Sequence, residues 1–164
     1  MEKFTFFWST QSPFSQWHPS PFVIDGNTFN CAEQYMMYEK AWLFGDEDTA
    51  HQILAATSPG TQKQLGRKVA PFNPEMWNKH CKQIVHDGNF EKFTQNQELL
   101  LKLLATKGTT LVEASPLDRI WGVGLAEDDP KIHNRKTWRG TNWLGEILTD
   151  LREELLKLRN KNEK

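Results

Sequence analysis

Pairs of turn-forming and helix-capping residues recur along this chain and limit the length of its elements. Asp25-Gly26 lies between apolar residues, a strong hairpin signal because glycine tolerates the positive φ of a tight turn. Ser58-Pro59 and Asn73-Pro74 each place proline where a first helical turn accepts it. Asp87-Gly88-Asn89 is typical of a helix end. These signals predict a hairpin followed by several short helices.

The segments between these signals predict the remaining elements. Leucines and an isoleucine form one stripe of an amphipathic helix over 143–159, and the chain after it is expected to fray over 158–164. We therefore predict an α+β fold, mostly helical with a small sheet or hairpin, in a single domain over 1–164. Strands are expected at 4–8, within 22–30 and at 109–114, and helices at 31–44, 47–57, 58–68, 73–86, 90–105 and 143–159.

Charge and cysteine content narrow the class of protein. The formal net charge of −1 disfavours a general nucleic-acid binder, which needs a basic field. Only Cys31 and Cys81 occur, without framework spacing, and neither a signal-type segment nor an apolar run of membrane-spanning length is present. The expected location is the cytoplasm.

The common catalytic and cofactor motifs are absent from the sequence. It contains no phosphate-binding glycine loop, no dinucleotide fingerprint, no HExxH pair and no nucleophile elbow. His80, Cys81 and His86 lie close together, but the lysines among them favour a solvated helix face over a zinc site. We therefore expect neither a metal nor a cofactor.

Glu33 and Lys40 are the first candidates for chemistry. They lie seven residues apart in NCAEQYMMYEK, almost two helical turns, so both side chains leave from one face of the helix. Structural roles are also open to them, since Asn30 and Glu33 have the spacing of a capping box and a lone lysine is usually solvated.

Four stretches, taken together, resemble the NADAR family, the YbiA-like N-glycosidases. They are SPFSQWHPSPFVIDGNTFNCAEQYMMYEKAWLFGD (12–46), LGRKVAPF (65–72), LVEASPLDRIWGVGL (111–125) and WRGTNWLGEILTDLRE (138–153). The resemblance implies a small α+β fold and cleavage of N-glycosidic bonds to a ribose. Its implied substrates are phosphoribosylamino intermediates of riboflavin synthesis or ADP-ribose attached to nucleobases.

The resemblance also implies which residues act. Glu33 and Lys40 match the family's Glu-x-Tyr-x-x-x-x-Lys stretch, Trp121-Gly122 its Trp-Gly pair, and Asn142 with Gly145 its Asn-x-x-Gly. Part of the family has an aspartate directly after Trp-Gly, where this chain has Val123. The nearest acids are Asp128 and Asp129, which precede Pro130 and equally suit a turn.

Cleavage of a ribosyl C1′–N bond builds positive charge on the sugar, so a nearby carboxylate and a proton donor are needed. Glu33 could stabilise that charge or activate water. Lys40 could act as a cation toward a phosphate or leaving group, or as a neutral amine that attacks C1′. Met36 and Met37 are expected to pack in the protein interior and not to contact a ligand.

The site residues expected from this reasoning form two groups. Trp121 would stack on a base or fill the core, Arg67 and Arg119 would contact phosphate or stay on the surface, and Asn142 would bind ligand or begin a helix. We also expect Glu33, Lys40 and Trp121 to share a cavity. The catalytic group is Glu33, Lys40, Trp121 and Asp129, and the substrate-binding group is Ser15, Arg67, Gly122, Arg119 and Asn142, with no metal ligand.

The function expected first is hydrolysis of an N-glycosidic bond between a ribose phosphate or ADP-ribose and a nucleobase-like amine. The alternative is a module that binds ADP-ribose or NAD without turnover, and a weaker one is an interaction domain that uses the C-terminal helix. The expected partner is a small phosphoribosyl or ADP-ribosyl substrate, with nucleic acid only as an ADP-ribosylated substrate and no membrane. The sequence leaves the oligomeric state open.

Overall fold

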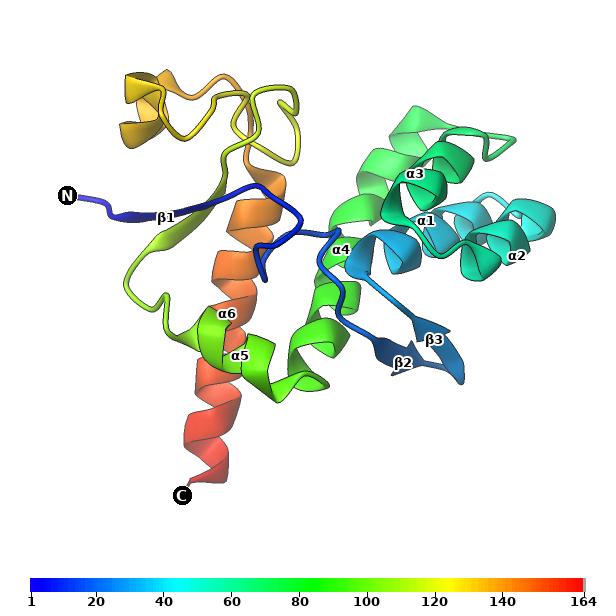
Figure 1. Cartoon of the computed structure of the whole chain (residues 1–164), viewed down its shortest axis with the longest axis horizontal. Coiled ribbons are helices and arrows are strands. Elements are labelled where there is room, and N and C mark those ends of the chain that lie inside the picture. The colour runs from blue at the N-terminus through cyan, green and yellow to red at the C-terminus, as the bar shows by residue number, and fades with distance from the viewer. Residues whose placement is uncertain (164) are drawn as a thin grey trace. The chain divides into compact units, whose positions relative to one another are not determined.

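The computed structural model describes residues 1–163, and the chain divides into two compact units. Unit 1 joins Met1–Ser15 to Glu98–Lys164, and unit 2 is Gln16–Gln97. The expected α+β, mostly helical fold is confirmed, while the single domain over 1–164 stays a prediction. The elements, many of them labelled in Figure 1, are β1 (Phe4–Phe7), β2 (Phe22–Ile24), β3 (Asn27–Phe29), α1 (Ala32–Leu43), α2 (Glu47–Ala55), α3 (Pro59–Arg67), α4 (Pro74–Thr94), α5 (Gln97–Leu104), β4 (Thr110–Glu113), the 3₁₀ helices η1 (Pro130–His133) and η2 (Arg135–Thr137), and α6 (Trp143–Asn162).

The predicted hairpin opens unit 2. Strands β2 and β3 pair antiparallel, with Ile24 opposite Asn27, so Asp25 and Gly26 form a two-residue turn. Their φ angles are 51° and 80°, and two positive values are what a type I′ turn requires. One face of the hairpin is buried against α1, where Phe22, Phe29 and Tyr35 form a cluster of aromatic rings.

Local signals set the ends of the helices in unit 2. Asp46, Ser58 and Asn73 each accept a backbone N–H bond from the first turn of the helix that follows, which satisfies a donor that the helix itself leaves unpaired. Helix α1 ends at Leu43, and Gly45 follows its C-cap, Phe44, with a φ of 73°. Gly45 N–H donates to the Trp42 carbonyl and Asp46 N–H to the Ala41 carbonyl, which together form a Schellman motif.

The predicted break at Asp87-Gly88-Asn89 is wrong, because α4 continues through it to Thr94. Gly88 faces Tyr35 of α1 so closely that a Cβ at this position would lie 2.6 Å from the Tyr35 ring. The glycine therefore permits close packing of two helices and does not end one. The helix predicted over 90–105 is correspondingly two elements, the end of α4 and the separate α5.

Unit 1 is built on a parallel pair of strands. Strand β1 pairs with β4 in the register Phe4 to Thr110 through Phe7 to Glu113, and α6 packs against β4 (Figure 1). A buried apolar cluster lies beside the pair, formed by Val112, Ala114, Val123, Leu125 and Ile132. The loop that follows β4 is thus part of the core of this unit.

Helix α6 begins as predicted at Trp143 and continues to Asn162. The first part of the tail expected to fray over 158–164 is therefore helical, and residue 164 lies outside the described residues. Leu151 and Leu155 are buried, which removes the apolar stripe from the surface and with it the basis for an interaction domain.

None of the helices within residues 1–163 has both the length and the apolar composition that crossing a bilayer requires.

Gly145 sits where α6 crosses β4, and a Cβ there would lie 2.1 Å from the Leu111 carbonyl oxygen. We expect Gly145→Ala to lower the free energy of unfolding by about 1–3 kcal/mol, because backbone must move to relieve this overlap. Urea denaturation measures the change.

Gly60→Ala in α3 is the control, since its Cβ meets nothing within 4 Å. That control should be neutral or stabilising by about 0.4–1 kcal/mol. Equal loss in both variants would contradict this account.

Candidate active site

Glu33 lies in the first turn of α1 and is 7% exposed. The predicted capping box is wrong, because the N-cap is Cys31 and its side chain makes no capping bond. Gln34 instead accepts the Asn30 N–H at 2.7 Å, and Gln16 contributes its main-chain oxygen to the Glu33 N–H at 3.0 Å. Gln34 thus accepts the Asn30 N–H that a capping box would assign to Glu33, and the Glu33 carboxylate is held in a buried setting where solvent screens charge weakly.

Lys40 follows two turns later on α1 and is half-buried. Desolvation lowers the pKa of its ammonium group, the Glu33 carboxylate raises that pKa, and the Arg67 guanidinium lowers it. The structure thus brings three predicted site residues, Glu33, Lys40 and Arg67, into one electrostatic group within unit 2. Arg67 itself is exposed, in the last turn of α3.

Gly66 explains how α3 brings Arg67 to this group. A Cβ at Gly66 would lie 2.0 Å from the Met37 sulfur, so α3 rests directly on α1 at this point. Met37 and its neighbour Met36 are both buried, in agreement with the packing role expected for them. The sulfur of Met37 therefore sets the spacing between the helix that holds Lys40 and the helix that holds Arg67.

Two aromatic residues that sequence reasoning missed lie against Lys40. Its Nζ is 4.8 Å from the centre of the Phe72 ring and 5.5 Å from that of Trp77. Phe72 is 46% exposed, and Phe44 supports it through an edge-on ring contact at 5.2 Å. The available signals were weak: Phe72 ends the stretch LGRKVAPF, and Trp77 is one of several tryptophans.

The segment that holds Phe72 is tied to α2 by Asp46. Its carboxylate accepts the Ala70 N–H at 3.0 Å while it also caps α2 through Thr49. These hydrogen bonds hold the pKa of Asp46 below its ordinary value, and the bond from the Ala70 N–H has the largest effect. The segment that places Phe72 against Lys40 is therefore attached to the N-cap of α2.

The other predicted residues belong to unit 1, and most lie along the loop after β4. Asp118 accepts the N–H groups of Ile120 and Trp121 at 2.9 Å each, which fixes the loop before the Trp-Gly pair. Trp121 is half-buried, with its ring edge-on to Trp143 at 5.6 Å. Arg119 in the same loop is exposed. Ser15, at the end of the N-terminal segment of this unit, is buried.

Gly122 and Asn142 are brought together by backbone contacts, since the Asn142 N–H donates to the Gly122 carbonyl at 3.0 Å. A Cβ on Gly122 would lie 2.9 Å from the Glu113 carbonyl oxygen, so this position accepts little beyond glycine. Val123, where part of the family has aspartate, is fully buried in the apolar cluster of unit 1. An acid at this position would replace a core side chain.

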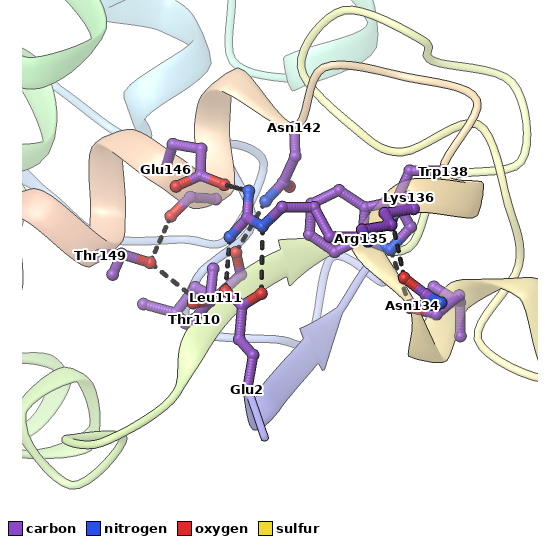
Figure 2. Close-up of polar contacts among 12 residues, drawn as sticks. Glu2, Thr110, Leu111, Asn134, Arg135, Lys136, Trp138, Asn142, Glu146 and Thr149 are labelled. Carbon is purple, nitrogen blue, oxygen red and sulfur yellow. Dashed lines mark hydrogen bonds and ion pairs between the residues drawn. The ribbon is translucent and has the colours of Figure 1, made fainter.

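Asn142 occupies the N-cap position of α6, but its amide is used elsewhere. Its Nδ2 donates to the Leu111 carbonyl at 3.0 Å, and its Oδ1 accepts the Glu113 N–H at 3.0 Å, so it links α6 to β4. Its φ is 53°, a conformation that asparagine tolerates better than most residues. Figure 2 shows the bond to Leu111, and the same view includes Arg135, which bridges Glu2 and Glu146. These contacts favour the structural alternative for Asn142.

Asp129 likewise has a structural contact. Its carboxylate accepts the Lys131 N–H at 2.9 Å and caps the 3₁₀ helix η1, the turn role that the sequence left open. Asp128, the neighbouring acid, is exposed.

The predicted site residues thus divide between the units, and their convergence on one cavity stays a prediction. Glu33, Lys40 and Arg67 belong to unit 2 and the others to unit 1. A cavity of about 340 Å³ in unit 2 is not lined by any of the predicted residues. Its lining consists of Glu39, Trp42, Leu43, His80, Gln83 and Ile84.

Unit 2 also contains a fully buried lysine, Lys92, that no sequence motif singles out. Desolvation lowers the pKa of Lys92 to about 7. Burial raises the pKa of the Cys31 thiol to about 11, and Lys92 acts against that shift. Lys92 and Cys31 therefore lie within electrostatic range of each other. Both are inside the unit, so neither is presented as a surface nucleophile.

No group of three or more histidine, cysteine, aspartate or glutamate side chains within residues 1–163 is arranged to hold a metal ion. The solvated face expected around Cys81 holds for Lys79 and Lys82, which are exposed, but it is wrong for Cys81, which is 1% exposed on the buried stripe of α4.

Comparison with known proteins gives consistent matches over most of the chain. A model of the NADAR domain matches residues 6–156. Protein irg-1 of Caenorhabditis elegans is 46% identical over 129 residues, which are 77% of this chain and 61% of that protein. N-glycosidase R617 of Acanthamoeba polyphaga mimivirus is 44% identical over 146 residues, 86% of each chain.

A solved structure agrees with these matches. N-glycosidase YbiA of Escherichia coli (strain K12) is 32% identical over 144 residues, 88% of this chain and 79% of that protein. Its NMR structure aligns with a TM-score of 0.79 at 29% identity, over 97% of this chain and 89% of that one. Fold and sequence together place the chain in a class of small α+β proteins that includes named N-glycosidases. The chain belongs to the NADAR family, as the four stretches predicted.

The electrostatic group of Glu33, Lys40 and Arg67 gives a direct prediction. Removal of the Arg67 charge in Arg67→Gln should raise the pKa of Lys40, because a like charge that disfavours the ammonium is lost. NMR titration of the lysine side-chain resonances measures the shift. Arg67→Lys keeps the charge and should leave the Lys40 pKa close to the wild-type value. A fall in the Lys40 pKa in Arg67→Gln would contradict the grouping of these charges.

Proposed function

We propose that this chain hydrolyses the N-glycosidic bond between a ribose phosphate or ADP-ribose moiety and a nucleobase-like amine. The enzyme class expected from the sequence, an N-glycosidase, is confirmed by relatives of that name at 44% and 32% identity over most of the chain. The substrate is our proposal, and it rests on the family resemblance and on the charges described above. A cytoplasmic location likewise stays a prediction.

The observation that carries the proposal is the buried carboxylate of Glu33 in one electrostatic group with two cations, Lys40 and Arg67. As the C1′–N bond lengthens, positive charge develops on the sugar, and a fixed carboxylate stabilises it most where water is excluded. The same carboxylate can take a proton from the attacking water. The guanidinium of Arg67 matches the oxygen geometry of a phosphate on the sugar.

Lys40 acts in this proposal as a cation. The faces of Phe72 and Trp77 both lie within cation–π range of its Nζ, and the Glu33 carboxylate favours the same charged form. Desolvation and Arg67 act in the opposite direction. An ammonium in this position can bind a phosphate oxygen or protonate the departing amine.

The roles proposed in unit 1 are narrower than those expected from the sequence. Trp121, half-buried in an ordered loop, is proposed to stack on the leaving base, and Arg119 to contact phosphate. Ser15 and Gly122 are proposed to line the sugar. The hydrogen bonds of Asp129 and Asn142 support structural roles, and the catalytic role of Asp129 and the substrate-binding role of Asn142 stay predictions.

Glu33→Gln should lower kcat by about 100-fold or more, the contribution typical of a positioned acid–base group. Chromatography of released base measures turnover on riboflavin intermediates and on ADP-ribosylated nucleobases. Glu39→Gln is the matched control, because it removes a half-buried glutamate from the same helix at the wall of the separate cavity. Full activity in Glu33→Gln would remove this carboxylate from the mechanism. Binding of ADP-ribose in calorimetry, with no base released from any candidate substrate, would favour the non-catalytic alternative.

A cationic Lys40 should give no covalent adduct with the sugar. Borohydride reduces and traps an imine between an amine and an opened sugar, and mass spectrometry under turnover conditions then reports added mass at Lys40. We expect the Lys40 peptide to keep its unmodified mass while product accumulates. A stable adduct at this residue would show that the neutral amine attacks C1′.

A further inference from the structure

The first turn of α1 is held by a residue from outside the helix. The side chain of Cys31, the N-cap residue, makes no capping bond, and the Glu33 N–H donates to the main-chain oxygen of Gln16 at 3.0 Å. Gln16 therefore supplies the partner that a capping side chain ordinarily provides. Its main chain is fixed directly against the residue that carries the candidate carboxylate.

The Gln16 side chain is fixed as well, from α4. Asn89 Nδ2 donates to Gln16 Oε1 at 2.8 Å, and the same nitrogen donates to the Val85 carbonyl at 2.8 Å. Because that nitrogen faces two acceptor oxygens, the orientation of the Asn89 amide follows from its surroundings. With Oε1 held by Asn89, the NH₂ group of Gln16 has a set direction.

Stability alone does not explain the amide at position 89. Asn89 is fully buried, and its Oδ1 has no hydrogen-bond partner among residues 1–163. A buried acceptor without a partner costs stability, and an apolar side chain of similar size would avoid that cost. Asparagine differs from such a side chain by its two Nδ2 bonds, to Val85 within α4 and to Gln16, and the bond to Gln16 is the one that reaches beyond the helix.

Within residues 1–163, the NH₂ group of Gln16 has only a weak partner. Its Nε2 lies 4.0 Å from the Met36 sulfur, and a thioether is a poor acceptor. Met36 follows Glu33 by three residues, so the two lie on one side of α1. Gln16 is half-buried, so part of it is accessible. A donor with a fixed direction is therefore presented on the same side of α1 as Glu33.

We propose that Gln16 binds the glycosyl part of the substrate by donating its Nε2–H to a sugar hydroxyl or phosphate oxygen beside Glu33. Asn89 is the positioning residue that orients this amide. The inference rests on the proposed function, and it adds a specificity-determining donor that the predicted site lacked.

Gln16→Glu tests the donor directly. The carboxylate keeps the length of the side chain, still accepts from Asn89 and leaves the main-chain bond to Glu33, but it cannot donate. We expect kcat/KM to fall by about tenfold or more, the value of one hydrogen bond, mainly through KM and with little change in Tm. Gln64→Glu, at an exposed position of α3, adds the same charge and should match the wild type.

Substrate analogues identify the oxygen. Against a 2′-deoxyribosyl or a dephosphorylated analogue, the loss caused by Gln16→Glu should shrink for the one that lacks the contacted oxygen. An equal loss for every analogue, or unchanged kinetics in the variant, would overturn the inference and leave the proposed function standing.

Calorimetry with ADP-ribose and ribose 5-phosphate separates the two proposals. Weaker binding of these probes by Gln16→Glu, together with no release of base from any candidate substrate by the wild type, would support the donor role and contradict the hydrolytic function. A wild-type protein that neither binds these probes nor releases base from any candidate substrate would overturn both.

Discussion

Close packing around α1 is the constraint on which unit 2 depends. Glycines make that packing possible from two directions, because Gly66 lets α3 rest on Met37 and Gly88 lets α4 rest on Tyr35. With a side chain at either glycine, the neighbouring helix would have to move away. The candidate site inherits this geometry, since Lys40 leaves from α1 while Arg67 leaves from the helix that Gly66 admits.

The elements that sequence reasoning predicted well are those whose causes are local. The Asp25-Gly26 turn and the caps at Ser58 and Asn73 depend on residues within one turn of the element they bound. Gly88 was misread because its reason is a ring on another helix, which no local pattern shows. The capping box failed for a similar reason: a distant backbone oxygen, that of Gln16, holds the first turn of α1.

In the candidate site, too, the residues that the sequence predicts are those with local causes, and the residues it misses reach the site only through the fold. Spacing and resemblance were sufficient to select Glu33 and Lys40, because both are encoded within one helix. Phe72 and Trp77 reach Lys40 only through the fold, and nothing in their own stretches marked them for a site. Asn142 could not be judged from sequence, because its spacing suits a ligand as well as the two backbone bonds it makes to β4.

The contact between Met37 and Gly66 has a consequence for the chemistry of sulfur. Oxidation of a methionine adds a polar oxygen to the thioether. The sulfur of Met37 fills the space where a methyl group on Gly66 would lie, so an oxygen added on the side that faces Gly66 has no room unless α3 moves away from α1. Oxidative damage on that side of this single buried atom would therefore separate the arginine at the end of α3 from the lysine on α1.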